Sequence, residues 1–144
     1  MSSLNAIKSS SVWPPSQFLT AKEEPRARNV LDEAHKKVGT PYLYGGNTDD
    51  GIDCSHFVHQ VYNAAGIQYP YLPTSADWKK AGFQETENPR RGDIIMWDGH
   101  MGIVADPEKK IFIGAQSSTG VAEAGYEEGK YWGKKPHHFL THEN

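Results

Sequence analysis

The sequence has a single cysteine, no long apolar run and no excess of positive charge. The lone Cys54 among 144 residues excludes an internal disulfide. No stretch approaches the roughly 18 apolar residues of a transmembrane helix, and the start of the chain lacks the apolar segment of a signal peptide. A formal charge of -3, with no Lys/Arg run longer than two residues, gives no basic footprint for nucleic acid. We therefore expect no nucleic-acid partner, no membrane span and no export by a signal peptide.

The composition that remains is typical of one small globular domain. Hydrophobic residues make up 37% and charged residues 23% of the chain, which favours a packed core over disorder. Fourteen glycines and nine prolines favour short elements joined by many turns, and so a mixed α+β fold. We expect an irregular leader over residues 1–25, with a single domain over residues 26–144 that is monomeric.

Two segments have helical spacing of apolar residues. The first runs over residues 26–38 and ends at Gly39, a suitable C-cap. The second runs from Cys54 to Ala65 and ends at Gly66. The loop between them, residues 39–51, is dense in turn residues and too long for an idle connection, which indicates a functional loop.

The second half of the chain predicts an antiparallel meander. Its strands are expected at residues 94–97, 101–105 and 111–115, joined by short turns. Before them, the proline-rich and aromatic residues 68–84 are typical of a groove wall, with a short helix reaching Lys80. After them, the tail of Val121 and Ala122 and then residues 131–140 is expected to add an edge strand.

Cys54 falls in the first turn of the predicted second helix, where Asp53 is placed to cap the helix. A helix N-terminus stabilises a thiolate by only about 0.3–1 kcal/mol, which is less than one pK unit. Full activation therefore requires a nearby cation, usually an imidazole paired with the sulfur. The plain alternative for a lone cysteine is a small buried hydrophobic side chain.

The sequence offers seven histidines as partners for this thiol: His35, His56, His59, His100, His137, His138 and His142. The first three lie on predicted helices, where solvated or capping roles are expected. The last three lie near a chain end that is expected to fray, as surface residues. His100 opens a strand after the Asp98-Gly99 turn, from which a rigid sheet can present it to a helix N-terminus. We therefore predict His100 as the base.

Four motifs in order give the chain a family resemblance. They are Gly39-Thr40-Pro41-Tyr42 with Tyr44-Gly45-Gly46, Asp53-Cys54-Ser55, Arg91-Gly92-Asp93, and Gly99-His100-Met101-Gly102-Ile103 followed by Phe112-Ile113-Gly114-Ala115. Over residues 30–121 the chain resembles the NlpC-type cysteine peptidases of bacterial cell walls, a papain-like α+β family. The resemblance implies a peptidase for peptidoglycan stems, typically cleaving between a γ-linked D-glutamate and a diamino acid.

The resemblance also assigns roles to individual residues. It implies Cys54 as nucleophile and His100 as base, and Tyr42 matches the family's tyrosine near the thiol. Asp53 and Ser55 match positions that recognise polar groups of the substrate. Each of these three also has a purely structural alternative: Tyr42 packing on Pro41, Asp53 capping the helix, and Ser55 filling its first turn.

The chain departs from the family pattern at two positions. The family usually orients the base with a polar residue, commonly a histidine, where this chain has Gly114. Gln116 shares that strand face, so we predict that its side-chain oxygen fixes the imidazole tautomer as the third catalytic residue; an ordinary loop residue is the alternative. His56 stands where the family has a small residue, and is expected to narrow the cleft.

Other functions stay open at this point. The same scaffold could serve as a thiol acyltransferase, as an amidase cutting the sugar-to-peptide bond, or as an inactive wall-peptide binding module. A zinc domain is disfavoured because Cys-x-x-Cys pairs are missing, and neither a metal nor a cofactor is expected. A wall substrate without a signal peptide resembles type VI secretion effectors held in check by an immunity protein. A cytoplasmic recycling enzyme or a phage lysis protein would equally be expected to lack a signal peptide.

Overall fold

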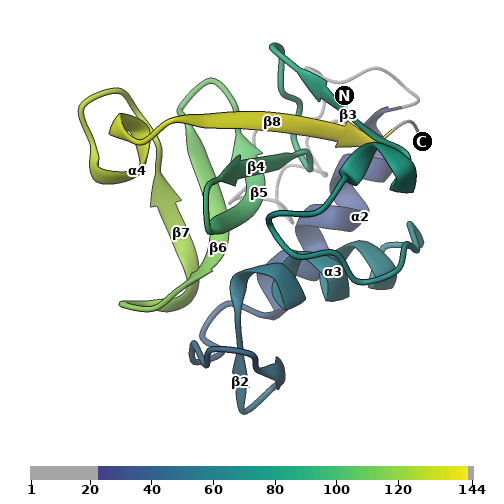
Figure 1. The fold of residues 1–144 in the computed structure, drawn as a ribbon, viewed down its shortest axis with the longest axis vertical. Coiled ribbons are helices and arrows are strands. Elements are labelled where there is room, and N and C mark those ends of the chain that lie inside the picture. Colours follow the sequence, from purple (N-terminus) through teal and green to yellow (C-terminus); the bar gives the residue numbers. More distant parts are fainter. Residues whose placement is uncertain (1–22, 143–144) are drawn as a thin grey trace, which may run out of the picture.

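The computed structural model describes residues 23–142, in which six antiparallel strands form one sheet with two helices against one face (Figure 1). The strand order is β3-β8-β4-β5-β6-β7. Strands β4 to β7 follow one another in sequence and in space, so the predicted meander is confirmed. The strand bounds are β3 Phe83–Thr86, β4 Ile94–Trp97, β5 His100–Asp106, β6 Ile111–Gln116, β7 Gly120–Gly125 and β8 His137–His142.

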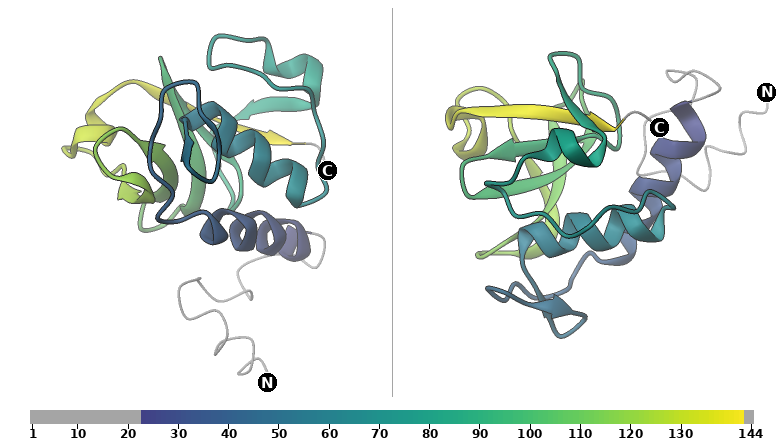
Figure 2. Two further views of the ribbon diagram at one scale, coloured as in Figure 1. Left: turned by 90° about the horizontal axis from the view of Figure 1, so that it is seen from below. Right: turned by 45° about the vertical axis from the view of Figure 1, so that its right-hand side comes forward.

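Helices α2, Glu23–Lys36, and α3, Cys54–Ala64, lie side by side on the sheet (Figure 2). Each buries one stripe of apolar side chains, because residues three and four apart share a helix face. The stripes are Ala27, Val30, Leu31 and Ala34 on α2, and Phe57, Val58, Val61 and Tyr62 on α3. Full burial of a large apolar side chain stabilises the fold by about 1.5–3 kcal/mol, more than helix propensity contributes per residue. Packing on the sheet therefore fixes where α3, and with it Cys54, lies.

The two faces of the sheet carry different cores. Alternation along β4 directs Ile94 and Met96 toward the helices and Ile95 and Trp97 away from them. The second group belongs to a smaller cluster, here called the outer-face cluster. Its buried members are Ile95, Trp97, Val104, Phe112 and Tyr126, with Ala124, Trp132 and Phe139 packed against them. His100 is the register partner of Trp97, so its side chain lies on this outer face.

The predicted edge strand is right for Val121 and Ala122, which lie in the edge strand β7, and wrong for residues 131–140. Residues Tyr131–Lys134 form one helical turn, α4, and β8 lies inside the sheet between β3 and β4. The expected fraying is wrong as well, because β8 is hydrogen-bonded on both sides. Of its three histidines, His138 is exposed as expected and His137 is half-buried, whereas His142 is buried against Phe83. The sequence alone did not predict this arrangement, because β3, one of the two strands that pair with β8, was itself not predicted.

Other boundaries differ only slightly from the sequence prediction. Helix α2 begins at Glu23 and ends at Lys36 rather than spanning residues 26–38, so the proposed leader ends earlier; its residues 1–22 lie outside the described part. The loop over residues 39–51 contains the two-residue strands β1, Asn47–Thr48, and β2, Gly51–Ile52. The short helix expected before Lys80 is the 3-10 turn η2, Trp78–Ala81. The predicted α+β class is confirmed.

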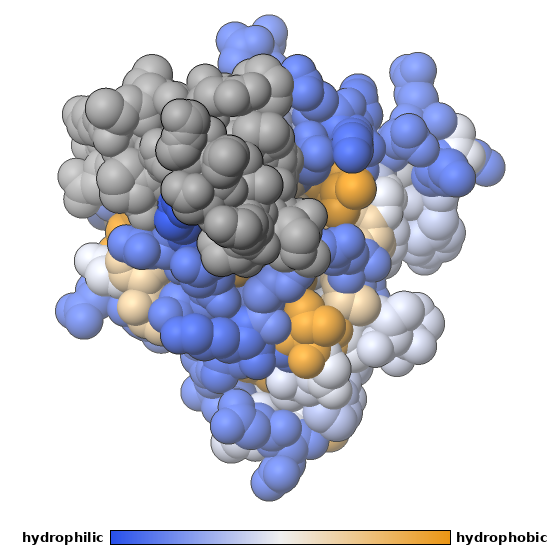
Figure 3. All heavy atoms as spheres, turned by 180° about the vertical axis from the view of Figure 1, so that it is seen from behind, coloured by the Kyte–Doolittle hydropathy of each residue, from blue (hydrophilic) through white to orange (hydrophobic). Residues whose placement is uncertain are grey.

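The surface seen from behind is mostly hydrophilic, with small, separate hydrophobic patches (Figure 3). Among residues 23–142, no helix has the length and apolar character needed to cross a bilayer.

Candidate active site

Cys54 begins α3, as predicted, and Asp53 is the N-cap, whose side chain accepts a hydrogen bond from the His56 backbone N–H. The half-buried sulfur lies close to the backbone groups of Met101, Ser55 and Cys54 itself, which favour a thiolate. Burial outweighs their effect and, together with the nearby Asp53 charge, raises the pKa of the Cys54 thiol. The contact with Met101 places the sulfur beside the residue that follows His100 in β5.

Both oxygens of the Asp53 carboxylate accept hydrogen bonds from the protein. One oxygen accepts bonds from the Ser55 hydroxyl at 3.2 Å and from His56 N and Nδ1, both at 2.9 Å. The other accepts from the Gly45 backbone N–H at 3.1 Å, which ties the 39–51 loop to the start of α3. The capping role of Asp53 is confirmed, and its role in substrate binding stays a prediction.

Tyr71 is a site residue that the sequence analysis did not single out. Its ring stacks on His56 with centroids 4.2 Å apart and planes 9° apart, and its hydroxyl lies 2.5 Å from the Ser55 Oγ. His56 is therefore held between Asp53 and Tyr71, and together these side chains form a wall beside Cys54. The aromatic and proline-rich segment 68–84 was the available signal, but it does not tell which of its tyrosines turns toward α3.

Tyr42 lies close to the start of α3. Its backbone pairs with Ile52 in a parallel bridge two residues before Cys54. Burial and then the nearby Cys54 raise the pKa of the Tyr42 phenol, which indicates that the hydroxyl and the sulfur are neighbours. Tyr42, Cys54 and Ser55 are thus brought together, while the action of Tyr42 and Ser55 on a substrate stays a prediction.

His100 and Gln116 meet on the outer face of the sheet, with His100 Nε2 and Gln116 Oε1 3.2 Å apart. The Gln116 amide nitrogen donates to Thr119 Oγ1 at 3.3 Å and to the Ala122 carbonyl at 3.4 Å, while the Thr119 hydroxyl donates to the Gly120 carbonyl at 2.8 Å. Since the Thr119 hydrogen is used there, its oxygen accepts from Gln116, and this fixes the amide orientation. Gln116 Oε1 therefore accepts from His100 Nε2–H, and Nδ1 keeps the lone pair that a base needs.

Gly114 is what makes room for this glutamine. A Cβ at position 114 would lie 2.5 Å from Gln116 Oε1 and 3.1 Å from a carbon of the Phe112 ring. The Gln116 amide thus occupies the space that a side chain at position 114 would take. The glycine at position 114 and the glutamine at position 116 therefore belong together. The Gln116 oxygen lies near His100 because position 114 has no side chain.

The imidazole of His100 is buried among aromatic rings. It stacks on Trp132 at 4.4 Å between centroids and lies 5.3 Å from Trp97. Burial lowers its pKa to about 4, although the hydrogen bond with Gln116 works in the opposite direction. With the Cys54 pKa raised as well, the free protein favours a neutral thiol and a neutral imidazole. Burial thus disfavours the thiolate-imidazolium pair that we expected, because it raises the pKa of the thiol and lowers that of the imidazole.

This burial predicts a loss of stability in acid. The unfolded chain binds a proton at His100 near pH 6.5, whereas the native state does so only near pH 4. Between these values the unfolded state holds more protons, so the free energy of unfolding falls as the pH falls, by up to about 3 kcal/mol from this residue. Urea denaturation at pH 7, 5.5 and 4 measures the loss, and in His100→Gln the loss should be smaller. An equal loss in the two proteins contradicts the prediction.

The remaining helical histidines have structural partners. His59 Nε2 bonds the Tyr69 carbonyl at 2.9 Å, and His35 lies 3.6 Å from Glu123. Within residues 23–142, no group of three or more His, Cys, Asp or Glu side chains is arranged to hold a metal ion.

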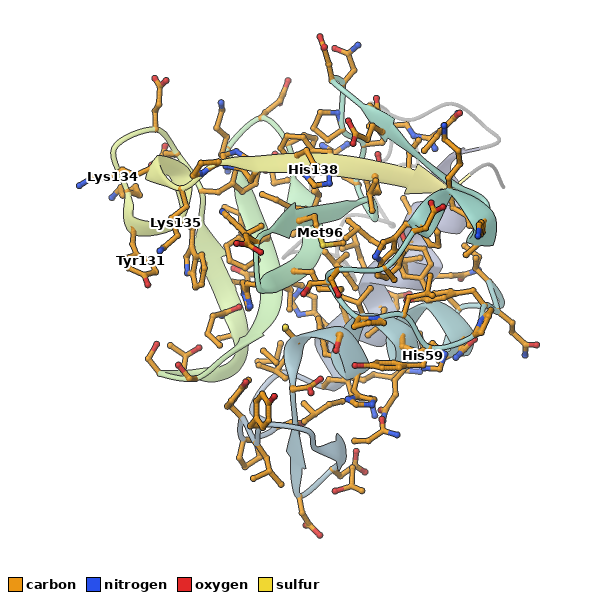
Figure 4. The ribbon with its side chains drawn as sticks, in the orientation of Figure 1. His59, Met96, Tyr131, Lys134, Lys135 and His138 are labelled. Atoms are coloured by element: carbon orange, nitrogen blue, oxygen red, sulfur yellow. The ribbon has the colours of Figure 1, made fainter. Side chains whose placement is uncertain are left out.

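A cavity of about 310 Å³ opens between the sheet and residues 74–79. Its floor is apolar and buried, made by Trp78, Phe83, Met96 and Leu140. His138 and Met96 line it from the neighbouring strands β8 and β4 (Figure 4). Met96 is the register partner of Met101, the residue whose backbone lies close to the Cys54 sulfur, but neither Cys54 nor His100 lines the cavity. Its wall comes from the segment in which we predicted a groove wall.

Comparison with known proteins identifies relatives of this site. Residues 39–141 match the model of the NlpC/P60 family. The chain is 35% identical over 117 residues to a gamma-DL-glutamyl hydrolase of Bacillus subtilis, covering 74% of this chain and 27% of that protein. It is 30% identical over 101 residues to a probable endopeptidase NlpC homolog of Haemophilus influenzae, covering 67% of this chain and 52% of that protein.

A solved structure extends the comparison to the fold. The NlpC/p60 domain of the peptidoglycan hydrolase SagA superposes with a TM-score of 0.59 at 25% identity, covering 80% of this chain and 97% of that domain. The chain thus spans nearly all of that domain but only about a quarter to a half of the two curated relatives. The predicted family and its papain-like α+β fold are confirmed, and with the match covering both Cys54 and His100, the chain belongs to the NlpC/P60 family.

Proposed function

We propose that this protein is a cysteine peptidase that hydrolyses the peptide stems of peptidoglycan. One observation carries the proposal: the Cys54 sulfur lies close to the backbone of Met101, and the preceding residue is a histidine whose Nε2 is held by Gln116 and whose Nδ1 keeps its lone pair. A thiol at a helix start with a basic nitrogen on the adjoining strand is the arrangement that nucleophilic acyl transfer requires.

The neutral resting pair favours general-base catalysis at the moment of attack. His100 Nδ1 takes the thiol proton as the sulfur forms its bond to the amide carbonyl carbon. The oxyanion that results can be met by the backbone N–H groups of Cys54 and Ser55, which lie beside the sulfur. His100 then gives the proton to the departing amine as the C–N bond breaks. Water, deprotonated by the same nitrogen, hydrolyses the thioester and restores the thiol.

The bond that we propose is the one between a γ-linked D-glutamate and a diamino acid. The support is the family resemblance and the name of the Bacillus relative, a gamma-DL-glutamyl hydrolase. Hydrolysis at this bond leaves a fragment ending in glutamate and a fragment starting with the free amine of the diamino acid. An acyltransferase would instead join the acyl group to an added amine, and a sugar-peptide amidase would release the whole stem.

Digestion of purified peptidoglycan and of a soluble stem tetrapeptide, with product masses read by mass spectrometry, tests the function. We expect the two fragments of the γ-glutamyl cleavage, and none with Cys54→Ala protein as the blank. Release of intact stems, or transfer products in the presence of an added amine, would favour the two alternative enzymes. Peptide binding without any cleavage would favour a binding module and refute the peptidase.

We propose further that the enzyme is an antibacterial effector, delivered to the periplasm of a rival cell by a type VI secretion system and neutralised at home by an immunity protein. The support is the proposed cell-wall substrate, together with the resemblance of small peptidoglycan peptidases to such effectors. An expression experiment in bacterial cells tests this point. Expression with an added periplasmic signal peptide should lyse the host, whereas cytoplasmic expression and periplasmic Cys54→Ala should not. Harmless periplasmic expression of an enzyme that is active in the digest contradicts the effector proposal.

A further inference from the structure

The most unusual neighbour of the candidate base is Trp132, which the prediction of an edge strand had left without a role. We propose that Trp132 is a positioning residue for His100: its indole lies against the imidazole, 4.4 Å away and tilted by 21°, and keeps the ring in the plane that Gln116 requires while excluding water from that face. The inference rests on the proposed function and deepens it, because it concerns the base of the same site.

The helical turn α4 that carries Trp132 is anchored on the sheet independently of His100. The Trp97 indole N–H donates to the Trp132 carbonyl at 2.9 Å. Lys135 Nζ lies 4.9 Å from the centre of the Tyr131 ring, and Figure 4 shows both side chains at the end of the molecule formed by α4. Gly133 permits a close backbone approach, since a Cβ there would lie 1.8 Å from the Glu127 carbonyl oxygen. The indole is thus presented to His100 by a fixed backbone.

Two contacts on different parts of the imidazole complement each other. Gln116 holds Nε2 at one point, which still permits the ring to swing about that hydrogen bond. Trp132 covers the face of the ring and prevents this swing. An indole face also attracts a cation, which would favour a protonated imidazole. The pKa of His100 lies instead at about 4, so the exclusion of water outweighs this attraction and the ring stays neutral and basic.

The elements around the imidazole carry other titratable groups that bear on any pH measurement. They are Cys54 on α3, Asp98 in the turn before β5, Tyr126 after β7, Lys134 and Lys135 at the end of α4, and His137 at the start of β8. The depressed pKa of His100 has burial as its largest cause, rather than any one of these charges. Removing the indole should therefore move the titration of His100 toward its ordinary value.

The test compares Trp132→Ala, Trp132→Phe and Phe139→Ala by steady-state hydrolysis of a stem tetrapeptide from pH 4 to 9. Phe139 is the matched control, because it packs in the same outer-face cluster and its ring contacts are with Tyr126 and His137. For Trp132→Ala we expect kcat to fall about tenfold and KM to stay within about twofold. The acid limb of the pH profile of kcat should shift upward by about one pH unit. Trp132→Phe should restore most of kcat and return the acid limb, and Phe139→Ala should leave the limb in place.

Two further measurements keep the inference testable apart from the catalytic function. Gly133→Ala should displace α4 and reproduce the Trp132→Ala profile without altering any side chain next to His100. The midpoint of the His100 ring-proton titration, followed by NMR without substrate, should rise in both variants. If this midpoint moves but wild-type protein cleaves no peptide, the contact stands and the proposed function fails. If the midpoint stays in place in Trp132→Ala, or moves as much in Phe139→Ala, the positioning role is refuted.

Discussion

Replacing Cys54 by alanine should reduce kcat/KM for stem-peptide hydrolysis by at least about 10⁴-fold, since the acyl-enzyme route requires the sulfur. His100→Ala should have an effect of the same order, because the pKa of the thiol is raised by burial and the sulfur then depends on the imidazole to remove its proton. Residues that act as one unit are not additive, so the double variant should be no slower than either single one. Steady-state hydrolysis of the tetrapeptide measures all three.

The matched control for these variants is His35→Ala, on α2 beside Glu123, which should keep wild-type kcat/KM. Thermal unfolding should show the active-site variants folded at the assay temperature, so that lost activity is not lost structure. Hydrolysis by Cys54→Ala at more than one per cent of the wild-type rate, or an additive loss in the double variant, would remove Cys54 and His100 from the roles that we give them.

Gly114→Ala should lower kcat on the order of 10²-fold, although a methyl group is the smallest side chain that can be added. The new Cβ would stand 2.5 Å from Gln116 Oε1, inside van der Waals contact, so the amide has to leave His100 Nε2. Without that acceptor the imidazole loses the constraint on its tautomer, and Nδ1 no longer carries the lone pair in every molecule. KM should change little, since neither residue belongs to the predicted substrate-binding set.

A double-variant cycle separates this explanation from general damage to the sheet. Gln116→Ala should lose as much kcat as Gly114→Ala, and the two changes together should cost no more than either alone, because both remove the same hydrogen bond. Gly125→Ala is the control on the neighbouring strand β7, where a Cβ meets nothing closer than 3.8 Å, and it should behave as wild type. Full additivity, or an active Gln116→Ala enzyme, would show that Gln116 is an ordinary residue of its strand.

The helices and the meander could be predicted from the sequence because their signals are local. Apolar spacing and a glycine stop define α3, and short β-branched runs separated by tight turns define β4, β5 and β6. Strand β8 could not be found in this way, since its position between β3 and β4 depends on partners far away in sequence. The same holds for α4, where one helical turn is held by contacts with Trp97 and residue 127 rather than by its own propensity.

The sequence by itself determined where the two residues of the proposed reactive pair lie. Asp53 before Cys54 specifies a helix start, and a turn before His100 specifies a strand start. Both positions can therefore be predicted from neighbouring residues in the sequence. Only the tertiary structure decided their chemical state, because desolvation depends on what covers a group. The stacking of Trp132 on His100 and the seating of the Gln116 amide over Gly114 join residues from separate elements: the first helps to bury the imidazole, which favours its neutral form, and the second holds its Nε2.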